Sequence, residues 1–150
     1  MLTEILTKDL VRLDVEGLET PEEVIRYSGQ LLKDAGKVRQ TYVDKMVEAF
    51  KTIGPYIVMA PGIAMPHARP SGDVLQPCVS FLRLKKPIRF GHSCNDPVKL
   101  VFALGGVADD SHIDLIRELG RLLEKDDNRR GLLEINSYED FKKMCEEAEL

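Results

Sequence analysis

The apolar run Val98–Val107 constrains the fold most. Lys99 is its only charged residue, and such a run is typical of a central strand that is covered on both faces. It is far shorter than the roughly 20 apolar residues that a membrane-spanning helix needs. A covered strand needs helices packed against the sheet that contains it. The run therefore predicts an α/β fold around a buried sheet.

The rest of the chain alternates between strand and helix patterns. Alternating or continuous apolar residues predict strands at 10–15, 57–60 and 78–84, and 88–90 is a weaker candidate. Helices are expected after the N-cap Thr20, over about 42–53, after Ser111, and after Ser137. In the first of these, Pro21 suits the first helical position and Glu23 completes a capping box with Thr20. This order predicts a single domain over residues 1–150, with a mixed sheet flanked by helices.

Composition excludes several classes of protein. The net charge is −4 with mixed signs along the chain, whereas a nucleic-acid binder carries a clustered basic face. The first ten residues lack the cationic start and long apolar stretch of a signal peptide, so a cytoplasmic location is expected. The three cysteines, Cys78, Cys94 and Cys145, show no CxxC spacing, and we expect reduced thiols rather than a disulfide framework.

His67 lies in a segment of unusual stiffness. Three prolines and a glycine between Pro61 and Pro70 exclude a regular helix, and the residues before Pro66 and Pro70 are pushed toward extended geometry. We therefore expect His67 on a rigid loop just after a strand. Such a loop exposes one imidazole to a large partner and limits the entropy lost when that partner docks.

His112 lies at the start of the helix expected after Ser111. It precedes Leu115, Ile116 and Leu119 by three, four and seven residues, so it shares their inward stripe. The free amides at a helix start bind anions, and a neutral imidazole there can donate another hydrogen bond to a phosphate oxygen. Both histidines follow apolar strands, which predicts a shared cleft at one edge of the sheet.

This pair of imidazoles suits phosphoryl transfer. A neutral imidazole near pH 7 is a good nucleophile toward phosphorus, and the transition state needs in-line approach and donors for its charge. The candidate donors are His112, Arg69 and the amides of the helix start. The chain has no GxxxxGK[ST] loop for a nucleotide and no carboxylate pair that indicates a metal site. We therefore expect neither a cofactor nor a metal.

The segment Gly62–His67 resembles the active-site signature of the mannitol/fructose-type enzyme IIA family of the phosphoenolpyruvate-dependent phosphotransferase system (PTS). Ser111-His112 resembles the family's second histidine, and the similarity in element order covers nearly the whole chain. Within the family, the segments most similar to the ascorbate-type branch are Gly54–Tyr56, Ala60–His67, Arg69-Pro70, Leu84–Pro87 and Asn95–Val98.

The resemblance implies a PTS-type IIA fold and a phosphotransferase role. Phosphate would pass from enzyme I to the carrier protein HPr, then to His67, then to a cysteine of enzyme IIB. Enzyme IIB would phosphorylate the sugar, ascorbate or a related compound, that the membrane component IIC takes up. In the family the first histidine is phosphorylated and the second stabilises the phosphoryl group, and these roles fall on His67 and His112.

One departure concerns charge near the site. Mannitol- and fructose-type members usually carry an Arg-Glu pair upstream of the signature, where this chain has Lys51-Thr52. Arg69 is our candidate for the missing positive charge.

Other functions stay open at this point. A regulatory domain of the same family would sense phosphorylation and bind a partner protein instead of feeding a transporter. A metal site would need His92, Cys94 and Cys78 to join His67 or His112, although their spacing matches no common zinc pattern. A Cys/His nucleophilic enzyme is disfavoured because no cysteine has an activating neighbour. Lone histidines are often structural, Arg69 alone is more often a solvated charge, and 61–70 could be only a rigid connector.

Overall fold

The computed structural model describes residues 2–108 and 111–148. In that part of the chain, five strands form one mixed sheet in the order β1-β4-β5-β3-β2. The strands are β1 (Val11–Val15), β2 (Val58–Ala60), β3 (Ile63–Ala64), β4 (Cys78–Ile88) and β5 (Val98–Gly105). The helices are α1 (Leu2–Ile5), the 3-10 helix η1 (Lys8–Leu10), α2 (Pro21–Asp34), α3 (Gln40–Ile53), α4 (Ser111–Leu123), α5 (Asp126–Glu134) and α6 (Tyr138–Glu147).

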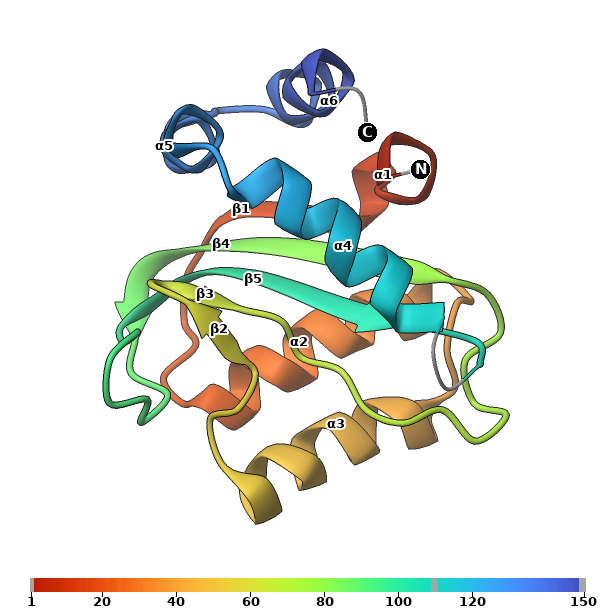
Figure 1. The fold of residues 1–150 in the computed structure, drawn as a ribbon. Coiled ribbons are helices and arrows are strands. Elements are labelled where there is room, and N and C mark those ends of the chain that lie inside the picture. Colours follow the sequence, from red (N-terminus) through yellow and green to blue (C-terminus); the bar gives the residue numbers. More distant parts are fainter. Residues whose placement is uncertain (1, 109–110, 149–150) are drawn as a thin grey trace.

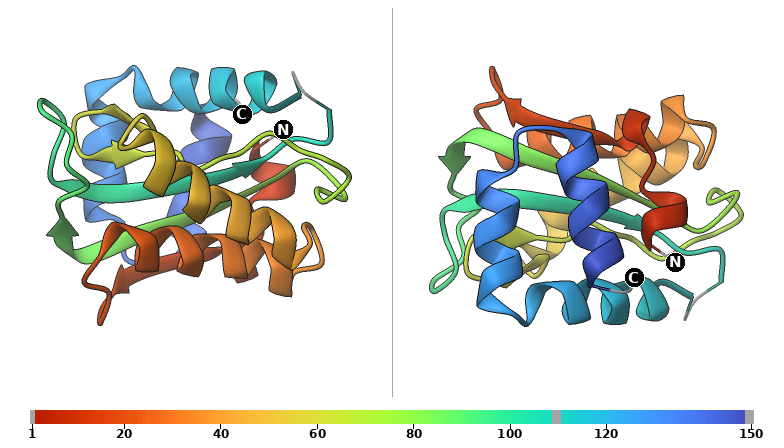
Figure 2. Two further views of the ribbon diagram at one scale, coloured as in Figure 1. Left: turned by 90° about the horizontal axis from the view of Figure 1, so that it is seen from below. Right: turned by 90° about the horizontal axis from the view of Figure 1, so that it is seen from above.

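The sheet is the middle layer of three. Helices α2 and α3 lie on one side of it, and α1, α4, α5 and α6 lie on the other (Figures 1 and 2). Strand β5 is central, and all of its residues except Lys99 are buried, which confirms the predicted covered strand. The strand ends at Gly105 and not at Val107, whose side chain is 48% exposed, because the chain leaves the sheet there toward α4. None of the helices among the described residues combines the length and the apolar character needed to cross a membrane.

The strand directions decide where the two histidine segments go. Strand β4 runs antiparallel to β5 and parallel to β1. Strand β3 runs parallel to β5, with Ile63 opposite Leu100 and Ala64 opposite Val101. Parallel strands end at the same edge of a sheet. The segment after β3, which holds His67, and the segment after β5, which leads to His112, therefore leave the sheet together.

Helix ends follow their predicted caps. The Thr20 hydroxyl accepts a hydrogen bond from the Glu23 amide at 3.2 Å, and the Ser137 hydroxyl accepts one from the Asp140 amide at 3.1 Å. Helix α3 ends at Gly54, whose φ of 101° favours glycine. Helix α4 begins at Ser111, as expected, but capping by the Ser111 side chain lies outside the described residues.

Several elements differ from the sequence expectations. The sequence predicts irregular loop where β3 lies, but two residues suffice to pair this strand with β5. The weak strand candidate at 88–90 forms no separate strand: Ile88 is the last residue of the long strand β4, and Arg89 and Phe90 lie beyond it. The register of β4 with β5 shifts between Arg83 and Ile88. Helices α1 and α5 have no counterpart among the predicted elements, since short amphipathic segments carry little periodic signal. The α/β class and the helix-flanked mixed sheet are confirmed.

Candidate active site

Backbone hydrogen bonds hold the His67 segment against the sheet. The Leu104 amide donates to the Pro66 carbonyl at 2.8 Å, so the segment continues beside β5 after β3 ends. On the other side, the Met65 amide donates to the Ile57 carbonyl at 2.8 Å. Together with the prolines, these bonds give His67 the rigid support that the sequence predicts.

The His67 ring is oriented by its own segment. Its Nδ1 lies 2.7 Å from the Met65 carbonyl oxygen. A carbonyl oxygen only accepts, so Nδ1 carries the proton and Nε2 keeps its lone pair. Burial of the imidazole lowers the pKa of His67 below its usual value, and the charge of His112 acts in the same direction. The hydrogen bond to Met65 opposes them but leaves the pKa lowered. Near neutral pH, His67 is therefore mainly neutral, with Nε2 available as the nucleophile.

His112 meets His67 directly. The two rings stack with their centroids 5.6 Å apart and their planes at 21°. The Nδ1 atom of His112 is buried and makes no hydrogen bond within the described residues. A buried nitrogen without a partner is costly, which makes this atom a candidate for a hydrogen bond with a bound group.

One pocket of about 340 Å³ contains all three predicted site residues. It is lined by Ile53, Tyr56, His67, Ala68, Arg69 and His112. Arg69 is exposed at its mouth, where a guanidinium can reach an incoming phosphoryl group. Lys51 and Thr52 are exposed residues of the last turn of α3 and do not line the pocket.

Two tyrosines that the sequence does not assign to the site support this pocket. The fully buried Tyr42 of α3 donates its hydroxyl to the Leu104 carbonyl at 2.5 Å and accepts from the Ala68 amide at 3.1 Å. Burial raises the pKa of Tyr42, so the hydroxyl stays a donor. Tyr56 contacts His67 itself. In the sequence, only the Gly54–Tyr56 motif points to a role for Tyr56. Nothing in the sequence distinguishes Tyr42 from other residues near a helix start.

The remaining histidine and the cysteines lie outside this pocket. His92 precedes β5, whereas the His67 pocket lies beyond the carboxyl end of β5. The Nδ1 atom of His92 accepts hydrogen bonds from the amides of Cys94 and Asn95 at 3.1 and 3.0 Å. Burial raises the pKa of the Cys78 and Cys145 thiols to about 12, which makes both poor nucleophiles. Within residues 2–108 and 111–148, no cluster of three or more His, Cys, Asp or Glu is placed to hold a metal ion.

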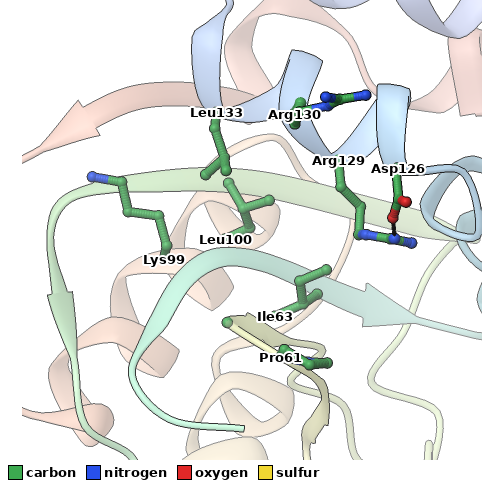
Figure 3. Close-up of a pocket in the computed structure, with 9 residues that line it drawn as sticks. Pro61, Ile63, Lys99, Leu100, Asp126, Arg129, Arg130 and Leu133 are labelled. Atoms are coloured by element: carbon green, nitrogen blue, oxygen red, sulfur yellow. Dashed lines mark ion pairs between the residues drawn. The ribbon is translucent and has the colours of Figure 1, made fainter.

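A second pocket, of about 480 Å³, lies where α5 faces the starts of β3 and β5 (Figure 3). Its floor is apolar and includes Ile63 and Leu100. The Arg129 guanidinium at its rim forms an ion pair with Asp126 (Figure 3). This pocket contains no candidate nucleophile, so the His67 pocket is the candidate active site.

A histidine with a free Nε2 beside a second histidine suits the class of proteins that carry a phosphoryl group, and sequence comparison identifies the family. The family described as "Phosphoenolpyruvate-dependent sugar phosphotransferase system, EIIA 2" matches residues 4–148. The chain belongs to this family.

Relatives in this family agree with the match. The ascorbate-specific PTS system EIIA component of Escherichia coli K12 is 35% identical over 119 residues, which cover 79% of this chain and 77% of the relative. The solution structure of the mannitol-specific cryptic enzyme IIA CmtB from Escherichia coli is 27% identical, with a TM-score of 0.83 and coverage of 96% and 97%. The Escherichia coli complex of enzyme IIAMTL and phosphorylated enzyme IIBMTL contains a chain that is 25% identical, with a TM-score of 0.83 and coverage of 93% and 96%.

Proposed function

We propose that His67 accepts a phosphoryl group from HPr through Nε2 and passes it to a cysteine of an enzyme IIB. The observation that carries this proposal is the hydrogen bond from Nδ1 of His67 to the Met65 carbonyl, because it leaves the Nε2 lone pair free. Membership of the EIIA family supports the direction of transfer. Residues 1–150 would then act as a single IIA domain, in the cytoplasm where we expect the relay to operate.

The transfer is a displacement at phosphorus. The Nε2 lone pair of His67 attacks the phosphorus of phosphorylated HPr, and the bond between the phosphorus and the donor atom of HPr breaks as the new N–P bond forms. The donor atom of HPr keeps the electron pair of the broken bond. The proton on Nδ1 stays in place, so the phosphorylated ring is positively charged. The Met65 carbonyl, 2.7 Å away, stabilises that charge.

The second transfer reverses this step. A thiolate of enzyme IIB attacks the phosphorus, an S–P bond forms, and His67 recovers the lone pair on Nε2. We assign His112 to the phosphoryl oxygens, since its buried Nδ1 has no hydrogen bond within the described residues. Arg69 would add positive charge from the solvent side of the pocket.

The mouth of the pocket suits a protein partner. Ile53 and Tyr56 line it, and their side chains are 69% and 39% exposed. Exposed apolar groups around a reactive polar centre are typical of a docking surface. A related enzyme IIA has been solved in complex with phosphorylated enzyme IIB, which supports enzyme IIB as the partner. The 35% identity to ascorbate-specific components leads us to propose ascorbate or a related sugar as the cargo.

The test is phosphorylation with purified enzyme I, HPr and phosphoenolpyruvate, followed by intact mass measurement and mapping of the acid-labile phosphate. We expect one phosphoryl group on His67, removed by enzyme IIB but not by a IIB variant without its active cysteine. His67→Gln should accept none. The matched control is His92→Asn, whose side-chain oxygen can replace the Nδ1 acceptor in the 92–95 turn, and it should accept phosphate normally.

The other outcomes separate the alternatives. A phosphate on His67 that no enzyme IIB removes would favour the regulatory sensor of the same family. A well-folded protein that takes no phosphate would refute the proposal. His112→Ala should still accept phosphate but transfer it slowly to enzyme IIB, and transfer at the wild-type rate would reduce His112 to a structural residue. Arg69→Ala should slow acceptance from HPr, and an unchanged rate would remove Arg69 from the site.

A further inference from the structure

Tyr56 is held beside the active site by a rigid turn. Helix α3 stops at Gly54, where φ is 101°, and Pro55 follows with its fixed φ. The Val58 amide donates to the Pro55 carbonyl at 3.0 Å and closes the turn that leads into β2. Tyr56 therefore leaves the backbone at a defined point, and its side chain lines the His67 pocket.

Tyr56 makes two separate contacts with His67. Its hydroxyl donates to the backbone carbonyl of His67 at 3.1 Å. Its ring packs edge-on against the imidazole, with centroids 5.6 Å apart and planes at 80°. His112 stacks on the same imidazole at the same centroid distance but nearly parallel. The His67 ring is thus confined by two aromatic neighbours in different orientations.

These contacts restrain motions of the His67 ring that the hydrogen bond to Met65 does not restrain by itself. One hydrogen bond at Nδ1 restrains the ring only while the backbone of His67 keeps its position relative to Met65. Tethering the His67 carbonyl holds that backbone, and the edge-on ring limits rotation of the imidazole. Small losses of alignment at a nucleophile cost large factors in rate.

We propose that Tyr56 is a positioning residue that holds His67 with the proton on Nδ1 and the lone pair of Nε2 directed into the pocket. Its effect on rate rests on the proposed phosphoryl transfer, whereas its effect on the imidazole does not. The inference gives the Gly54–Tyr56 motif a role. The glycine ends α3 and the proline stiffens the turn. The tyrosine then reaches across to the nucleophile.

A tyrosine elsewhere in the chain provides a matched control. Tyr138 donates its hydroxyl to the Leu6 carbonyl at 2.9 Å, and it lines a different pocket, next to α6 and η1. Tyr138→Phe therefore removes the same kind of hydrogen bond away from His67. Tyr56→Phe removes only the hydroxyl at the site, and Tyr56→Leu removes the ring as well.

The experiment measures the imidazole first. In protein labelled with ¹⁵N-histidine, with the His67 signals assigned from the His67→Gln variant, proton–nitrogen correlation spectra across a pH series report the tautomer and pKa of His67. Tyr56→Phe should lower the fraction with the proton on Nδ1. Tyr56→Leu should also move the pKa of His67 up toward its usual value, because the ring becomes more hydrated. Tyr138→Phe should change neither quantity.

Rates come second. Tyr56→Phe should lower the maximal rate of acceptance from phosphorylated HPr by about two- to ten-fold, the range that one net hydrogen bond represents. The HPr concentration at half-maximal rate should stay unchanged. Thermal unfolding and circular dichroism should show that each variant is folded, as expected for a side chain that is 39% exposed.

Three results would overturn the proposal. His67 signals that stay the same in both Tyr56 variants would show that Tyr56 does not position the ring. A rise in the half-saturating HPr concentration with unchanged His67 signals would make Tyr56 a docking residue instead. Equal changes in Tyr138→Phe would mean a general loss of stability. If the wild-type protein takes no phosphate, the proposed function fails, and the spectra still decide the role of Tyr56.

Discussion

The Tyr42 hydroxyl links the segment after His67 to the end of β5, and Tyr42→Phe removes that link while keeping the ring. The hydroxyl donates to the Leu104 carbonyl at 2.5 Å and accepts from the Ala68 amide at 3.1 Å. In the variant, a carbonyl and an amide lose this partner at a fully buried side chain. Each such group costs about 1–3 kcal/mol when left unsatisfied. Allowing for partial relaxation, we expect a loss of about 2–4 kcal/mol in the free energy of unfolding.

Urea unfolding followed by circular dichroism measures this loss, and amide hydrogen exchange localises it. At about 2–4 °C per kcal/mol for a chain of this size, the loss corresponds to a melting temperature lower by about 4–16 °C. The Ala68 amide should exchange faster. The control is Tyr27→Phe, since Tyr27 is a half-buried residue of α2, and it should stay within about 0.5 kcal/mol of wild type. A Tyr42→Phe loss below that figure, with unchanged exchange at Ala68, would refute the reasoning.

Two further predictions concern pH and packing. Because burial lowers the pKa of His67 in the folded state, the unfolded chain binds this proton more readily. Stability that is present above the unfolded value of about 6.5 is therefore lost as pH falls through it toward the folded pKa, at no more than about 1.4 kcal/mol per pH unit. His67→Gln should flatten the dependence of the urea midpoint on pH, and an unchanged slope would show that His67 does not cause this dependence. Gly105→Ala should lower the free energy of unfolding by about 1–3 kcal/mol, since the added Cβ would lie 2.7 Å from the Cys78 sulfur. Adding Cys78→Ala should recover part of that loss in a double-mutant cycle, and strict additivity would show that the clash is not the cause.

Local chemistry makes much of the fold readable from the sequence. The central strand follows from an apolar run with one charged residue, and the helix ends follow from Thr20, Ser137 and Gly54, whose backbone roles depend only on near neighbours. Strand β3 escapes prediction because two residues carry no periodicity. The apolar pattern places the end of β5 two residues late, since it does not record where a chain turns away from its sheet.

Some features of the site can likewise be predicted from local sequence, and others depend on the tertiary structure. The stiffness of the His67 segment and the inward position of His112 depend on prolines and helical spacing, which are local. Their contact is not local, because it requires β3 to pair in parallel with β5 so that both segments leave the sheet at one edge. The tyrosines show this most clearly, since the hydroxyls of Tyr42 and Tyr56 reach carbonyls 62 and 11 residues away.

The sequence by itself determined the α/β class, the covered central strand, one histidine on a proline-rich segment and a second histidine at a helix start. Only the tertiary structure decided which nitrogen of His67 is free and which aromatic rings confine it. It also showed that Arg69 reaches the pocket while Lys51 does not. The physical reason is range. Propensities, caps and proline restrictions act over a few residues, whereas the direction of a side chain depends on contacts that strand pairing brings together.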